Sequence, residues 1–163
     1  MIPEFIWIYH SLPLFIFTVM VLLIKRAGVF WRTLYSCAIA TLIVFLFFIL
    51  LPVEYPRPAV HSASLSATFL TLTQKVDAAL NTCPSSHVAF AWLMFLAATR
   101  TQWASKEPWL ARMSLFWAIG ISLSTLVLKQ HFIIDVFAGM AVAAASFYLA
   151  KYFPNRTCAP NYQ

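Results

Sequence analysis

The chain has 163 residues, of which 62% are hydrophobic and only 10% are charged, and its formal net charge is +6. A soluble domain carries about 25% charged residues, so the composition excludes an ordinary soluble protein and indicates an integral membrane protein with a single domain, residues 1–163. The basic residues are dispersed among apolar stretches, so we expect no nucleic-acid partner. The three cysteines, Cys37, Cys83 and Cys158, form no disulfide or metal-binding pattern.

Apolar stretches recur along the whole chain, and a membrane-spanning helix needs about 20 mostly apolar residues. The stretches predict spans over 5–24, 34–51, 87–100, 109–128 and 131–153. Pro13 is placed to kink the first span, and Pro52 ends the second. We therefore expect an all-α membrane protein, a bundle of about five transmembrane helices.

The long polar connection over residues 53–86 contains a repeating apolar pattern. Its apolar residues recur at helical spacing, at Leu65, Phe69, Leu72, Val76 and Leu80. This pattern predicts an amphipathic helix that lies on the membrane surface, before the third span. We expect its apolar stripe to pack on the bundle, and an alternative role is to flank the entry of a lipid to the site.

The basic residues divide unequally between the two faces of the expected membrane. Three lie on the face of the polar connections, and these are Arg57, Lys75 and Lys129. Eight lie on the opposite face, and these are Lys25, Arg26, Arg32, Arg100, Lys106, Arg112, Lys151 and Arg156. Because basic loops stay in the cytoplasm, we expect the polar connections to face the periplasm or cell exterior. A short chain with few loops fits a bacterial inner membrane.

A histidine and a carboxylate lie four residues apart at the start of the last span, His131 and Asp135. On a helix these positions share a face, so Asp135 can fix the tautomer of His131 and leave the other ring nitrogen free as a nucleophile or base. Arg57 offers a fork of donors to phosphate oxygens. Ser85 and Ser86 stand where the third span begins, where backbone N–H groups can hold an anion.

These residues suit phosphoryl transfer. His131 can attack phosphorus, while His87 can protonate the leaving oxygen and later activate water. Ser124 either contacts phosphate or bonds a backbone carbonyl within its own helix. A metal site made of His87, His131 and Asp135 is a competing chemistry. We expect no metal and no other cofactor, because cations and N–H donors can hold the developing charge.

The pattern resembles that of the type 2 phosphatidic acid phosphatase (PAP2) superfamily of membrane lipid phosphatases and phosphotransferases. That pattern is Lys-x6-Arg-Pro, then Pro-Ser-x-His, then Ser-Arg-x5-His-x3-Asp. The matching residues lie in segments 55–58, 84–87 and 124–135, and they are Arg57, Pro58, Pro84, Ser85, His87, Ser124, His131 and Asp135. Two basic positions of the pattern hold Leu50 and Thr125 instead. Lys129 lies close by, and we expect it to be a solvated loop residue.

The resemblance implies a role for each matching residue. His131 is the nucleophile that forms a phosphohistidine, Asp135 is its partner and His87 is the general acid. The residues expected to contact phosphate are Arg57, Ser85, Ser86 and Ser124. The resemblance also implies the partners, a lipid bilayer and a membrane lipid phosphate as substrate.

The leading hypothesis is therefore a lipid phosphate phosphatase that acts on a phosphomonoester or pyrophosphate. Leu50 and Thr125 also make the chain similar to the branch of inositol phosphorylceramide and sphingolipid synthases. One alternative is thus a head-group phosphotransferase with the same histidine chemistry. Two further alternatives are a non-enzymatic transporter or proton relay, and a degenerate family member with a structural role.

Overall fold

The computed structural model describes residues 1–60, 63–77, 81–100 and 108–154. This part of the chain is helical and contains no strand, which confirms the all-α class. The elements are η1 (Pro3–Phe5), α1 (Ile6–Tyr9), α2 (Leu12–Leu23), α3 (Ala27–Leu50), α4 (Leu65–Val76), α5 (Ser86–Thr99), α7 (Pro108–Val127), α8 (Ile133–Leu149) and η2 (Ala150–Tyr152). Of the residues discussed above, Leu80, Lys106, Arg156 and Cys158 lie outside the described ranges.

Four helical segments are long and apolar enough to cross a bilayer, so the chain is a membrane protein. They are Pro3–Leu23, Ala27–Leu50, Trp109–Val127 and Ile133–Tyr152. The third of the five predicted spans corresponds to α5, an apolar helix of 14 residues. At 1.5 Å per residue α5 is about 21 Å long, which is shorter than the hydrocarbon core of about 30 Å.

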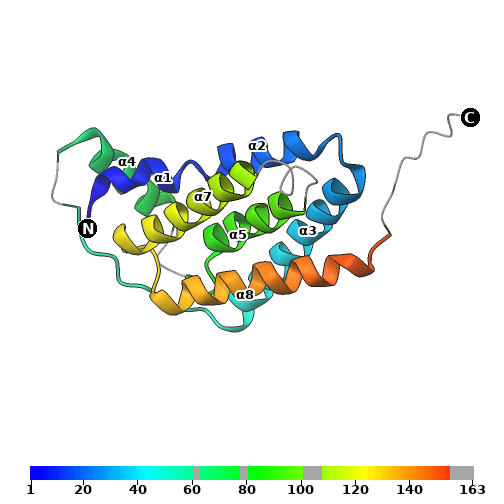
Figure 1. The fold of residues 1–163 in the computed structure, drawn as a ribbon. Helices are drawn as coiled ribbons and strands as arrows, with labels where there is room; N and C mark the ends of the chain where they lie inside the picture. The colour runs from blue at the N-terminus through cyan, green and yellow to red at the C-terminus, as the bar shows by residue number, and fades with distance from the viewer. Residues whose placement is uncertain (61–62, 78–80, 101–107, 155–163) are drawn as a thin grey trace, which may run out of the picture.

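The short helix α5 lies at the centre of the bundle and packs against α2, α3, α7 and α8 (Figure 1). Small side chains such as Ala89, Ala91 and Ala97 are fully buried on it and let its neighbours approach closely. The closest approach is at Gly139 of α8, where a Cβ atom would lie 2.6 Å from the backbone oxygen of Ser85. The surrounding helices therefore shield α5 and hold its first turn in place.

The first two spans differ from the apolar stretches of the sequence, one by a break and the other by its starting residue. The first span breaks between α1 and α2, just before Pro13, as its position predicts. The second begins at Ala27 and not at residue 34, so the predicted start is wrong. Arg32 lies inside α3 because its guanidinium donates a hydrogen bond of 3.0 Å to the backbone oxygen of Phe147 on α8. A neighbouring helix thus accepts a hydrogen bond from a charged group that an isolated helix would leave exposed to lipid.

The amphipathic helix is present as α4, but a different face of it packs on the protein. The hydroxyl of Ser64 accepts a hydrogen bond of 3.2 Å from the N–H of Ala67 and caps the helix. The buried face contains Leu70, which is 0% exposed, whereas Leu72 and Val76 of the predicted stripe are 51% and 88% exposed. The expectation that the stripe packs on the bundle is therefore wrong.

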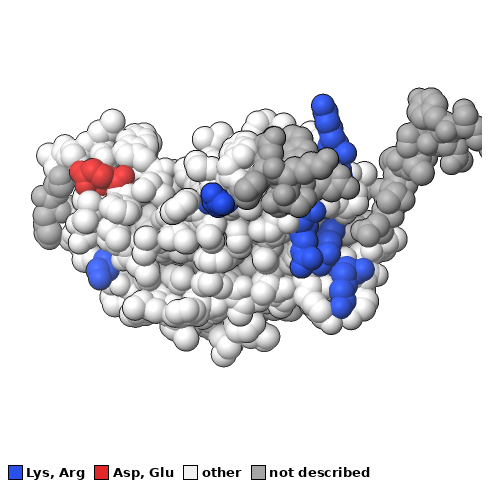
Figure 2. Space-filling model, in the orientation of Figure 1, with Lys and Arg blue, Asp and Glu red and all other residues white. Residues whose placement is uncertain are grey.

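Charges gather at opposite ends of the bundle. Figure 2 shows acidic side chains at the end that carries α1 and α4, and most of the basic side chains toward the other end. The basic end holds the turn between α2 and α3, with Lys25 and Arg26, and also Arg100 at the end of α5. The separation predicted from the sequence is thus present in the described residues.

Candidate active site

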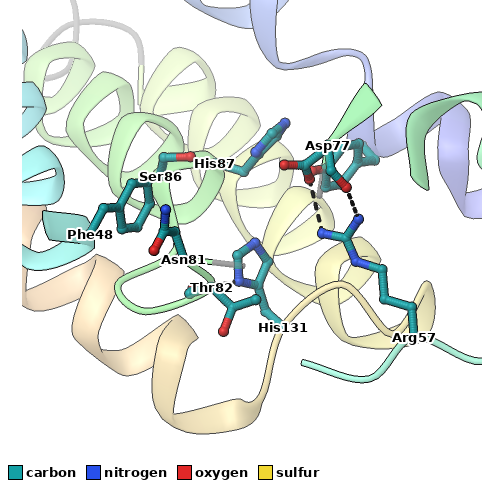
Figure 3. Close-up of a pocket in the computed structure, with 9 residues that line it drawn as sticks. Phe48, Arg57, Asp77, Asn81, Thr82, Ser86, His87 and His131 are labelled. Carbon is teal, nitrogen blue, oxygen red and sulfur yellow. Dashed lines mark hydrogen bonds and ion pairs between the residues drawn. The ribbon is translucent and has the colours of Figure 1, made fainter. Parts of the chain in front are cut away.

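A cavity of about 330 Å³ opens at the end of the bundle where α5 and α8 begin. Figure 3 shows the side chains around it, which come from parts of the chain that lie far apart in the sequence. The lining residues are Tyr9, Phe48, Arg57, Asp77, Asn81, Thr82, Ser86, His87 and His131. The cavity therefore brings together Arg57, His87 and His131, one residue from each of the three sequence motifs.

His131 lies in the turn before α8, and its ring orientation is fixed by the backbone of a distant loop. Its Nδ1 is 2.8 Å from the carbonyl oxygen of Thr82. A carbonyl can only accept a hydrogen bond, so Nδ1 carries the proton and donates it. In the neutral ring Nε2 then has a free lone pair, which is the state that a nucleophilic histidine requires.

Asp135 supports His131 differently from the expected contact. One carboxylate oxygen, Oδ2, accepts a hydrogen bond of 2.9 Å from the N–H of Phe132 and lies 3.6 Å from His131 Nδ1. The pair is therefore not two positions on one helix, because His131 precedes α8 and Asp135 occupies its first turn. Asp135 is buried, so its charge acts on His131 at short range while the Thr82 carbonyl fixes the tautomer.

His87 faces the cavity from the first turn of α5 and stacks on Tyr9. The two ring centroids are 4.0 Å apart and the planes are inclined by 22°. Tyr9 is itself buried and lies edge-on against His10, with the centroids 5.4 Å apart. The stack limits the rotation of His87, so its position beside the cavity is set by packing as well as by the helix.

Arg57 is engaged by Asp77, the residue that follows α4. The Arg57 guanidinium donates to the backbone oxygen of Asp77 and, at 3.0 Å, to its carboxylate oxygen Oδ2 (Figure 3). The Arg57 side chain is 7% exposed and that of Asp77 is 54% exposed. A phosphate that binds Arg57 must therefore replace or share a contact that a carboxylate already makes.

The serines expected to bind phosphate divide into two groups. Ser86 lines the cavity. Ser85 is buried, and its hydroxyl caps α5 by accepting from the N–H of Val88 at 3.5 Å. Ser124 is also buried, and its hydroxyl donates to the carbonyl of Ile121 at 2.7 Å. For Ser124 the structure thus shows the backbone bond and not a place in the cavity wall.

The two positions that lack the basic residues of the family pattern do not reach the cavity. Leu50 ends α3 and is 71% exposed. Thr125 is buried, and its hydroxyl donates to the carbonyl of Ser122 at 2.7 Å. Lys129 is exposed, as expected of a solvated loop residue. Among the described residues that line the cavity, Arg57 is therefore the one permanent cation.

Four polar or aromatic residues of the cavity carry no signal in the sequence motifs. Tyr9 lies in the first apolar stretch, Asp77 ends an amphipathic helix, and Asn81 and Thr82 lie in a polar loop. In the described part of the chain, Asn81 Oδ1 and Thr82 Oγ1 are buried without a hydrogen-bond partner. These two atoms are available to a ligand. The one sequence signal for Asn81 and Thr82 is their position shortly before the Pro-Ser-x-His segment, which places them near the predicted site.

Cys83 lies beside the site without the properties of a nucleophile. Burial and the neighbouring Asp135 carboxylate raise the pKa of its thiol to about 11. The thiol is therefore protonated at neutral pH, and a thiol reacts poorly compared with its thiolate.

Among the described residues, no group of three histidine, cysteine or acidic side chains is arranged to hold a metal ion.

A family model described as the PAP2 superfamily matches residues 4–149 of the chain. No curated protein and no solved structure gives a significant match.

Proposed function

The chain belongs to the PAP2 superfamily, whose members are generally phosphatases, and on this premise we propose that it is a metal-independent lipid phosphate phosphatase. The family match covers both histidines, the arginine and the carboxylate named above. The proposed substrate is a membrane lipid that carries a phosphomonoester or a pyrophosphate. The reaction passes through a phosphohistidine on His131.

The observation that carries this proposal is the tautomer of His131. Its Nδ1 donates to the Thr82 carbonyl, so Nε2 has a free lone pair beside a cavity that also presents His87 and Arg57. A nucleophile, an acid and a cation are the groups that phosphoryl transfer to an enzyme needs in the absence of a metal. A transporter has no need for a histidine held in one tautomer beside an arginine.

The first step transfers the phosphoryl group to the protein. His131 Nε2 attacks phosphorus, the P–N bond forms and the P–O bond to the lipid breaks. Burial lowers the pKa of His87 to about 3, so its ring is neutral before the substrate binds. It takes a proton from the bound phosphate monoanion and passes it to the leaving oxygen, and the lipid alcohol departs. Arg57 and the N–H groups at the start of α5, next to Ser86, stabilise the charge on the phosphoryl oxygens.

The second step releases phosphate. The now neutral His87 takes a proton from a water molecule, whose oxygen attacks phosphorus. The P–N bond breaks, and His131 returns to its neutral state with Nδ1 still bonded to Thr82. The buried Asp135 carboxylate stabilises the positive charge that His131 carries in the phosphohistidine.

The test is phosphate release by the purified protein in detergent or vesicles, with a panel of lipid phosphates. We expect release with at least one lipid and its loss in His131→Ala. The folded state of the variant is checked by its thermal unfolding. Vanadate, which mimics the pentacoordinate state, is expected to inhibit, and a chelator is expected to leave activity intact. No release from any lipid by folded wild-type protein would contradict the proposal.

A head-group phosphotransferase is the second candidate, and the composition of the cavity favours it. Asp77 and Asn81 place acceptor oxygens in the wall of the cavity that also contains the nucleophile, where they can bind the hydroxyl of an alcohol. In that case an alcohol replaces water in the second step. Addition of a lipid or polyol alcohol to the assay distinguishes the two: a phosphatase releases phosphate, whereas a transferase forms a new phosphomonoester of the added alcohol and releases little phosphate.

We also propose that the site faces the periplasm or cell exterior of a bacterial inner membrane. The separation of charges along the bundle supports this orientation, because the basic end is expected in the cytoplasm. The test labels single cysteines in a background without the native ones, Ala59→Cys at the site end and Lys25→Cys at the basic end. A membrane-impermeant maleimide added to intact cells is expected to label only the first variant.

A further inference from the structure

A second cavity, of about 410 Å³, adjoins the active-site cavity along α4. Its lining residues are Tyr9, His10, Phe69, Leu72, Thr73, Val76, Asp77 and His87. We call it the α4 groove. The α4 residues that line it follow the spacing of one helix face, and that face is the apolar stripe that does not pack on the bundle.

The α4 groove is apolar although it contains polar residues. His10 Nε2 lies 2.8 Å from Thr73 Oγ1, so these two groups satisfy each other. The other α4 side chains that line the groove are apolar, and these are Phe69, Leu72 and Val76. An exposed apolar groove in a membrane protein gains free energy when it covers a hydrocarbon chain, because apolar surface leaves water.

The groove is held open by contacts between α4 and α1. Trp7 donates from its indole Nε1 to Ser66 Oγ at 3.1 Å, and its ring lies 5.0 Å from that of Phe69, measured between centroids. Leu70 packs with Ile6 in a buried cluster under the helix. These contacts fix α4 against α1, so the groove does not need a ligand in order to form.

The two cavities meet at His87, Tyr9 and Asp77, which line both of them. This position matters for the reaction, because the oxygen that leaves phosphorus is the atom that joins the phosphate to the rest of the lipid. The general acid must stand beside that atom. His87 stands at the boundary between a cavity with a phosphate-binding arginine and a groove with an apolar wall.

From this arrangement we propose that the α4 groove binds the hydrocarbon chain of the substrate while the active-site cavity binds its phosphate. The proposal rests on the proposed phosphatase function and makes it more specific. The substrate class is a long-chain monophosphate ester, whose ester oxygen lies beside His87. The apolar stripe of α4 is then a recognition element for the chain.

The kinetic test compares two exposed leucines of the same helix. Leu72 lines the groove, whereas Leu65 is 66% exposed and lies outside it, so Leu65→Gln is the matched control for Leu72→Gln. The substrates are dodecyl phosphate and butyl phosphate. We expect Leu72→Gln to raise the KM for dodecyl phosphate about tenfold more than the KM for butyl phosphate, since a glutamine removes apolar contact with the long chain. Leu65→Gln is expected to leave both values as in wild type.

Equal effects of Leu72→Gln on the two substrates, or equal effects of the two variants on dodecyl phosphate, would overturn the proposal. A second measurement does not require turnover. A dodecyl phosphate with a diazirine at the chain end is bound to His131→Ala and irradiated, and the labelled peptides are mapped by mass spectrometry. We expect the label on α4, and we expect excess dodecyl phosphate to compete for it more strongly than dodecanol.

The labelling experiment separates the two proposals. If the wild-type protein releases no phosphate but His131→Ala is labelled on α4 in a phosphate-dependent way, the groove assignment stands and the phosphatase proposal is contradicted. Label elsewhere in the bundle would overturn the groove assignment. Equal competition by dodecanol would also overturn it, because the groove would then be a general contact with membrane lipid.

Discussion

The packing of α8 on the start of α5 gives the sharpest prediction about this fold. Gly139 faces the backbone of Ser85, and a Cβ atom at residue 139 would lie 2.6 Å from the Ser85 oxygen. It would also lie 3.1 Å from the Cβ of Val88. Gly139→Ala therefore cannot be accommodated by rotating a side chain. The first turn of α5 has to move away from α8.

The size of this movement follows from the distance. A carbon and a carbonyl oxygen approach to about 3.3 Å, so α5 must shift by about 0.7 Å at Ser85. Overpacking of this kind costs about 1–3 kcal/mol, and the better helix propensity of alanine offsets about 1 kcal/mol of it. The shift also carries His87 away from its place in the active site. A misplacement of this order lowers turnover by about ten- to a hundredfold.

The assay measures thermal unfolding in detergent and phosphate release on the same samples. Gly120→Ala in α7 is the matched control, because its Cβ would lie 3.5 Å from Ile8 Cγ2, an ordinary contact distance. We expect Gly120→Ala to unfold at the wild-type temperature or above it and to keep its activity, and we expect Gly139→Ala to lose activity and unfold earlier. If both variants behave alike, the close contact between α8 and α5 does not position the site.

The remaining predictions concern single side chains around the active site. Asp77→Asn removes the charge that competes for Arg57, and because a partly exposed ion pair contributes about 0.2–1 kcal/mol, we expect the KM for a lipid phosphate to fall by up to about fivefold; a KM that rises would mean that Asp77 orients Arg57 instead of occupying it. Asp135→Asn keeps an oxygen that caps α8 but loses the charge beside His131, so we expect kcat to fall by about ten- to a hundredfold at nearly constant KM. A loss of activity as complete as that of His131→Ala would show that the hydrogen bond to the Thr82 carbonyl does not hold the His131 tautomer by itself. Cys83 has a raised pKa of about 11, so its alkylation, taken as the difference between wild type and Cys83→Ala, should be slow at pH 7 and rise toward pH 11. Fast alkylation at pH 7 would contradict a thiol that is neutral at that pH.

Several elements followed from local sequence because local physics decides them. The long apolar stretches became helices, and α7 (Pro108–Val127) begins and ends within a residue of its predicted range. The start of α5 followed from Ser85, whose hydroxyl caps the helix as serines do at helix starts. The start of α3 was wrong because a carbonyl on α8 satisfies Arg32, and that partner lies far away in the sequence.

The amphipathic helix shows where the pattern alone is insufficient. Its spacing identified a helix correctly, but the face that packs was decided by the surface it meets. Ser66 bonds Trp7, and Leu70 enters the cluster around Ile6, which turns Leu72 and Val76 outward. In a membrane protein an apolar helix face can contact lipid without a hydrophobic penalty. A stripe of apolar residues therefore does not show which face packs on the protein, as it does for a helix in water.

The motifs predicted three functional groups at one end of the bundle, and the active-site cavity is lined by all three of them. Spacing was enough for this, because Arg57, His87 and His131 each lie near the end of an apolar segment on the same side. The partners of these groups came only from the fold. The Thr82 carbonyl reaches His131 across 49 residues, and Asp77 reaches Arg57 across 20. Such contacts depend on how helix surfaces pack, and no local pattern of residues encodes them.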